Sequence, residues 1–121
     1  MTEYLIAFND AWVPDLTEDE LGVASKRVRA LREEMTAAGV LVFTGGLADD
    51  APMFSVDASS GTAVVTDGPY VETKEHLGGL AIIDVADEDA ARLWAKKVAV
   101  ACGWPQEVRP FRRAPRPPAA G

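Results

Sequence analysis

Residues 77–101 read LGGLAIIDVADEDAARLWAKKVAVA, and this stretch decides the fold. Its first nine residues, 77–85, predict a strand whose centre is apolar on both faces. Asp87 is a typical helix N-cap, and the acids that follow it suit the positive end of a helix dipole. The helix is expected to end at Gly103 and to lead into a short last strand over residues 106–111. Its predicted buried stripe consists of Ala90, Leu93, Trp94, Val98 and Ala101.

A similar unit precedes this one in the chain. Residues 3–9 alternate as a strand does, and Thr17 with Glu20 forms a capping box at the start of a helix. The helix is expected to run to Ala38, with Gly39 just beyond its end, and a strand over 40–47 should follow. The predicted apolar face of this helix consists of Leu21, Ala24, Val28, Leu31, Met35 and Ala38.

A hairpin is predicted between the two units, from strands over 53–57 and 62–66 joined by a turn at 58–61. The order is therefore β-α-β, hairpin, β-α-β. Right-handed crossovers place both helices on one face of a mixed four-stranded sheet. The predicted fold class is α+β: a ferredoxin-like sandwich with a hairpin insertion, formed by one domain over residues 1–111.

Two helices can cover only one face of that sheet, yet three strands are apolar on both faces, at residues 4–8, 40–43 and 80–83. A bare second face would be a larger apolar patch than monomers usually expose. The simplest cover is the sheet of a second copy, so we expect a homodimer with a cleft. A ligand pocket is an alternative use of the same surface. The pairs Gly45-Gly46 and Gly78-Gly79 predict close approach of neighbouring backbones.

Composition excludes several classes of protein. The 121 residues carry a net charge of -7, which disfavours nucleic-acid binding by the domain. Cys102 is the one cysteine and His76 the one histidine, so neither a disulfide nor a Cys/His zinc site can form within the chain. No apolar run approaches the roughly 20 residues of a spanning helix. A single thiol and an acidic N-terminus favour the cytoplasm, without a membrane contact. No metal or cofactor is expected.

Charge is divided unevenly along the chain. Residues 1–108 hold 8 basic and 19 acidic side chains, whereas residues 109–121 hold four arginines, four prolines and no acid. We expect residues 112–121 to be a disordered tail, because this Pro/Arg/Ala composition cannot build a core. The tail could rest on the acidic body or contact an anionic partner.

Residues 66–79 read TDGPYVETKEHLGG and closely resemble the signature of the YCII-related family, in its DGPF-type branch. Gly39-Val40 and Glu107-Val108-Arg109-Pro110 match further along, and Tyr70 replaces the usual phenylalanine. The resemblance implies a dimeric ferredoxin-like α+β barrel, a largely unestablished function and an association with extracytoplasmic-function sigma factors. It also implies a histidine base on the first helix in the YCII branch proper, but that position falls at or beside Val28.

The signature segment holds the candidate site residues. Asp67 and His76 are the catalytic candidates, since a carboxylate and an imidazole could exchange a proton across a folded loop. Tyr70, Glu72 and Lys74 are the ligand-binding candidates, with Lys74 offering a charge to an anion. Each of these residues also has a purely structural interpretation. Asp67 could stabilise a turn, and His76 could be an ordinary surface histidine. Tyr70 could fill the core, and Glu72 and Lys74 could be solvated charges.

Three functions remain open from the sequence. The first is a dimeric, cofactor-free protein that binds an unknown small molecule near residues 67–76 in an accessory or regulatory role. The second is a small hydrolase, isomerase or lyase that uses Asp67 and His76. The third is a protein-interaction module associated with a sigma factor.

Overall fold

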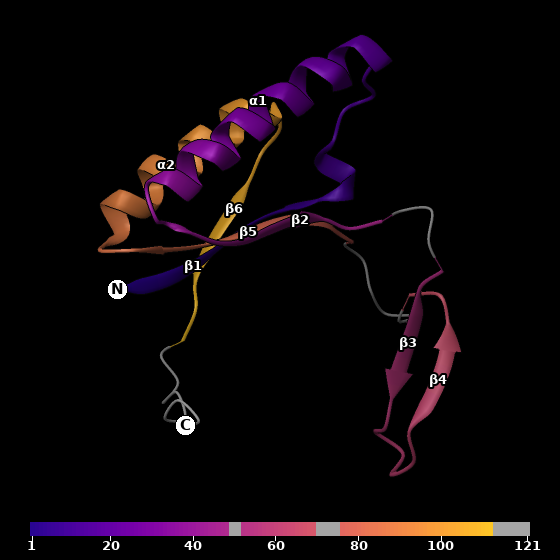
Figure 1. Cartoon of the computed structure of the whole chain (residues 1–121). Coiled ribbons are helices and arrows are strands. Elements are labelled where there is room, and N and C mark those ends of the chain that lie inside the picture. The colour runs from indigo at the N-terminus through magenta and orange to yellow at the C-terminus, as the bar shows by residue number, and fades with distance from the viewer. Residues whose placement is uncertain (49–51, 70–75, 113–121) are drawn as a thin grey trace.

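The computed structural model of this chain describes residues 1–48, 52–69 and 76–112. Figure 1 shows two helices together on one side of a sheet, with a separate hairpin at the sheet's end. The elements are β1 (Thr2–Asn9), a short 3-10 turn (Asp10–Trp12), α1 (Glu18–Ala37), β2 (Leu41–Gly46), β3 (Phe54–Asp57), β4 (Val64–Asp67), β5 (Leu77–Val85), α2 (Glu88–Cys102) and β6 (Glu107–Pro110).

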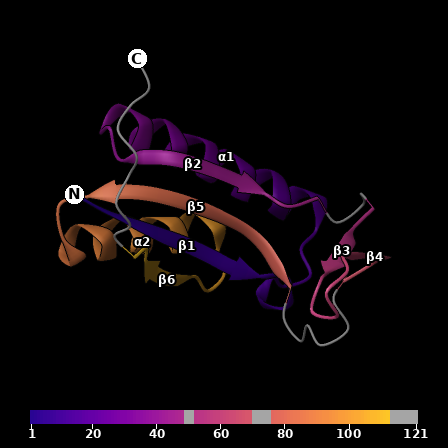
Figure 2. The same ribbon diagram turned by 90° about the horizontal axis from the view of Figure 1, so that it is seen from below.

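The four-stranded sheet has the order β2-β5-β1-β6, which Figure 2 shows from the side away from the helices. This is the split β-α-β arrangement of a ferredoxin-like α+β fold. β1 and β2 run in the same direction, as a crossover helix requires, but β5 lies between them. Every pair of neighbouring strands is therefore antiparallel, whereas the β-α-β units alone suggested a mixed sheet.

Both helices begin and end as their sequences predict. Thr17 accepts from the Glu20 amide at 3.1 Å, and Glu20 accepts from the Thr17 amide at 3.2 Å, which completes the capping box. Asp87 caps α2 through the Ala90 amide at 2.8 Å. Gly103 ends α2 with φ of +93°, a conformation that glycine adopts without strain.

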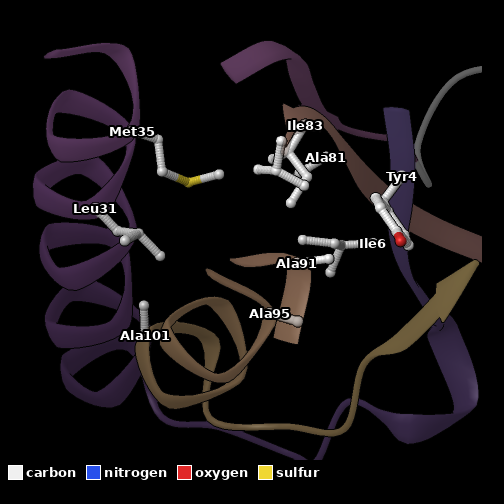
Figure 3. Close-up of a cluster of buried hydrophobic side chains, with 10 residues drawn as sticks. Tyr4, Ile6, Leu31, Met35, Ala81, Ile83, Ala91, Ala95 and Ala101 are labelled. Atoms are coloured by element: carbon white, nitrogen blue, oxygen red, sulfur yellow. The ribbon is translucent and has the colours of Figure 1, made fainter. Parts of the chain in front are cut away.

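The core lies between the helices and one face of the sheet. Figure 3 shows Leu31 and Met35 of α1 pointing towards the side chains of Ile83 and Ala81 on β5. Alternate residues of β1 and β5 turn to this side, as the two-residue period of a strand requires. The buried cluster consists of Tyr4, Ile6, Leu31, Met35, Ala81, Ile83, Val85, Ala91, Ala95 and Ala101.

The predicted helix stripes need correction at their edges. In α1, Ala24, Leu31 and Met35 are buried, but Leu21, Val28 and Ala38 are exposed. Leu21 and Ala38 lie at the two ends of a helix about 30 Å long, where the apolar stripe extends past the core. Val28 lies between the buried Ala24 and Leu31, is 39% exposed and borders a cavity between the helices and the sheet.

In α2 the stripe is rotated from the predicted one. Ala91, Ala95 and Ala101 are buried, whereas Leu93 is 55% exposed. Trp94 and Val98 are partly buried against the core. Small side chains face the sheet because they let the helix approach it closely.

The second face of the sheet carries Leu5, Ile82 and Phe43 side by side, since the register pairs Leu5 with Ile82 and Ile82 with Phe43. Leu5 and Ile82 are partly buried within the single chain, and Phe43 is 57% exposed. Arg109 of β6 continues this row beside Leu5. We call this surface the open face.

The hairpin of β3 and β4 stands apart from the rest of the domain (Figure 1). Its turn is closed by the Gly61 amide, which donates to the Ala58 carbonyl at 3.0 Å, as the sequence predicts. Its two strands pack on each other, and no other described element packs extensively against them.

Candidate functional site

The structure places the two catalytic candidates on different elements. Asp67 ends β4, opposite Phe54 in the hairpin, and its side chain is exposed. His76 precedes β5; its side chain is also exposed, and its carbonyl accepts from the Asp10 amide at 2.9 Å. Within the described ranges, no hydrogen bond or ion pair joins the side chains of Asp67 and His76. Their proposed proton exchange stays a prediction.

Tyr70, Glu72 and Lys74, the three ligand-binding candidates, lie outside the described residues. Most of the tail predicted to be disordered, residues 113–121, lies outside them as well.

A cavity of about 220 Å³ lies elsewhere, between the two helices and the sheet. Neither Asp67 nor His76 lines it. Its wall is mainly apolar and comes from both helices, β1, β2, β5 and the segment after α2. The lining residues are Ile6, Phe8, Val28, Leu31, Arg32, Met35, Leu41, Thr44, Gly45, Gly46, Leu80, Ala81, Val98, Ala101, Cys102, Trp104 and Gln106.

Two contacts between α1 and α2 hold the helical side of this cavity. Near one end, Arg27 Nε donates to the Ala101 carbonyl at 3.1 Å, where a cation also suits the negative end of α2. Further along, Lys97 Nζ pairs with Glu34 Oε1. The Glu34–Lys97 pair is half exposed, so its contribution to the free energy of unfolding is small. Val28 and Leu31 lie between these two contacts on α1.

The sheet side of the cavity is fixed by Phe8. Its ring packs edge-on against Trp104, with centroids 5.4 Å apart and planes at 69°, a favoured aromatic geometry. A Cβ on Gly79 would lie 2.9 Å from atoms of the Phe8 ring and 3.3 Å from the Gly45 carbonyl oxygen. Gly79 is therefore required for the close approach of β1, β2 and β5 that the glycine pairs predict. Gly46, in contrast, meets nothing within 4 Å.

The polar groups of the wall are few. Thr44 Oγ1 already donates to the Leu80 carbonyl at 3.1 Å, and Gln106 Nε2 donates to the Trp104 carbonyl at 3.3 Å. The titratable groups in the lining are Arg32 and Cys102. The Arg32 guanidinium offers only hydrogen-bond donors, so it could face an anion but not abstract a proton.

Comparison with known proteins matches the YCII-related domain model to residues 13–108 of this chain. The chain belongs to the YCII-related family. It is also 31% identical over 114 residues to the Uncharacterized protein R00369 of Rhizobium meliloti (strain 1021), covering 88% of this chain and 89% of that one.

In this YCII-related protein, the helix position at which the sequence resemblance implies a histidine falls at or beside Val28, and Val28 lines the cavity. The wall is therefore aliphatic at that point. The sequence missed Phe8, Arg32 and Trp104 as lining residues, because helix and strand patterns report burial and not an empty volume. The Gly45-Gly46 pair was the available signal, since both glycines line the cavity.

Within the described ranges, no group of three or more His, Cys, Asp or Glu side chains is placed to hold a metal ion. No helix there has the length and apolar character needed to cross a bilayer.

Cys102 of this YCII-related protein is expected to react slowly. Burial raises the pKa of its thiol, and the nearby Arg27 charge only partly opposes that rise. Because the thiolate is the nucleophile, iodoacetamide should alkylate native Cys102 more slowly at pH 8 than the same residue in urea. Mass spectrometry of timed samples measures both rates, and equal rates would contradict the partly buried placement of Cys102.

Proposed function

We propose that this protein binds a small, mainly apolar molecule in the cavity between its helices and its sheet, in an accessory or regulatory role. The observation that carries this proposal is the cavity itself, at about 220 Å³ with a largely apolar wall. An engineered apolar cavity of about 150 Å³ binds benzene, so this volume suits a ligand somewhat larger than a single aromatic ring.

The chemistry of the wall favours binding over catalysis. The described lining contains no carboxylate and no imidazole, and burial raises the pKa of its thiol, Cys102. General acid–base catalysis needs a group that titrates near the working pH. Arg32 supports a ligand with an anionic group at one end, since a guanidinium binds carboxylates well. Benzoate and toluene are therefore suitable probes, one with and one without an anionic group.

The Val28→Phe variant should test the site directly. Val28 is exposed at one edge, so a larger ring can enter the cavity without displacing a buried neighbour. We expect benzoate affinity to fall at least about tenfold, measured by titration of backbone amide resonances. Leu21→Phe is the matched control, because Leu21 is an exposed residue of the same helix that does not line the cavity.

Two outcomes would count against this site. Equal affinities of the two variants would place the probe elsewhere on the protein. Failure of both benzoate and toluene to shift the amides of Ile6, Leu31 and Val98 at millimolar concentration would remove the binding proposal.

A homodimer is the second proposal, supported by the row of Phe43, Ile82 and Leu5 on the open face. Apolar groups on a sheet face gain free energy when a partner removes them from water. Sedimentation of the wild-type protein over a range of concentrations tests this proposal. Association with a sigma factor, and catalysis by Asp67 and His76, stay predictions.

A further inference from the structure

We propose that the β3–β4 hairpin is an arm whose apolar face packs on a second copy of this chain. This inference rests on the proposed homodimer and adds which part of each protomer holds its partner.

The hairpin has two chemically different faces. Its register pairs Phe54 with Asp67 and Val56 with Val65, so Phe54, Val56 and Val65 share one face. These three side chains are 65%, 58% and 64% exposed within the single chain. The opposite face carries Ser55, Thr66, Asp57 and one valine, Val64. Only the first face, which we call the arm face, is mainly apolar.

An isolated two-stranded hairpin is at best marginally stable in water, and it needs a third strand or another packed element. The described elements of the body supply no extensive packing against it. The Gly68 amide donates to the Met53 carbonyl at 2.7 Å and Ser55 Oγ donates to the Gly68 carbonyl at 2.7 Å, but both bonds are internal to the hairpin. Among the residues that the structure describes, none covers the arm face, and a second molecule could do so.

The position of the hairpin points to a second copy as that molecule. Figure 1 shows the hairpin reaching beyond the sheet on the side away from α1 and α2, which is the side of the open face. A protomer placed against the open face would therefore lie beside the arm. In a two-fold dimer each copy offers one arm and one open face, so the two apolar surfaces are covered in both copies at once.

The extent of apolar surface agrees with this arrangement. A stable dimer buries about 800 Å² on each partner, with a core depleted of charge. The open face also carries charges: Glu3 is paired with Asp84 beside the apolar row, and Glu107 and Arg109 are successive residues of β6 on this face. The arm face adds three apolar side chains, Phe54, Val56 and Val65, with only Asp67 as a charge.

The test compares two neighbouring positions of β4 that point to opposite faces. Val65→Asp places a charge on the arm face, and Thr66→Asp places the same charge on the other face. Sedimentation equilibrium of the full-length proteins should show a dimer dissociation constant at least about tenfold weaker for Val65→Asp than for wild type. Thr66→Asp should remain within about threefold of wild type. Phe54→Asp and Ser55→Asp form a second pair of the same design.

The possible results distinguish failure of the arm proposal from failure of the dimer proposal. A wild-type dimer that Val65→Asp and Phe54→Asp leave unchanged would overturn the arm while keeping the dimer. A wild-type monomer at all concentrations would overturn both. Equal weakening by the variants on both faces would show a general charge effect and would also overturn the arm. Far-UV circular dichroism of each variant verifies that the body is folded.

Discussion

Replacement of Ile83 by alanine should lower the free energy of unfolding by about 2–5 kcal/mol, the range for buried aliphatic truncations. Ile83 lies on β5, an interior strand of the sheet, with 0% of its surface exposed, and it belongs to the cluster between the helices and the sheet. Removing its outer carbons leaves a void that a close-packed interior can only partly fill. Since domains of this size are stable by about 5–15 kcal/mol, the loss would be a large fraction of the total.

Urea denaturation followed by circular dichroism measures this change, with all samples at one protein concentration because dimerisation would alter the apparent stability. Leu93→Ala is the control. Leu93 is 55% exposed on α2, and its truncation should cost less than about 1 kcal/mol. A loss at Ile83 no larger than that at Leu93 would contradict the described core.

Gly79→Ala should destabilise the protein by about 1–3 kcal/mol, the usual cost of overpacking. Its new methyl group would lie 2.9 Å from two atoms of the Phe8 ring and 3.3 Å from the Gly45 carbonyl oxygen. Phe8 cannot yield freely because Trp104 packs against it, and the Gly45 oxygen belongs to a paired strand. The variant should also bind benzoate more weakly, because Phe8 forms part of the cavity wall.

Gly46→Ala is the matched control, since it makes the same chemical change on the adjacent strand, where a Cβ meets nothing within 4 Å. We expect its free energy of unfolding to remain within about 0.5 kcal/mol of wild type. Thermal or urea unfolding of the two variants side by side gives the comparison. Similar losses in both would show that backbone propensity, and not contact with Phe8, determines the effect.

The order of the elements could be predicted from the sequence because each boundary carries its own chemistry. The Thr17–Glu20 capping box, the Asp87 cap and Gly103 all act locally, and the structure confirms them. The side of a helix that becomes buried depends on distant partners, which is why the stripe of α2 was wrong at Leu93. Ala91 and Ala95 are buried because the sheet lies close to them, and an alanine-rich helix gives little indication of its orientation.

The candidate site was harder to predict than the fold. The polar signature of residues 66–79 indicated a site because it is rich in reactive groups. The cavity instead comes from apolar residues of distant segments, such as Phe8, Leu31 and Trp104. An empty volume results from how closely α1, α2 and the sheet can approach, and no single segment encodes that distance.

The link between β2 and β5 has a consequence for how the chain can be rearranged. The Leu47 amide donates to the Gly78 carbonyl at 2.9 Å, so the pairing of these strands extends to the point where the chain leaves the sheet and returns to it. The segment between β2 and β5 is thus a long connection between two strands that are already paired where it begins and ends. Doubling the length of such a loop costs only about 0.6 kcal/mol of closure entropy. New termini cut at the Ser59–Ser60 tip, or a foreign peptide grafted there, should leave the four-stranded sheet assembled.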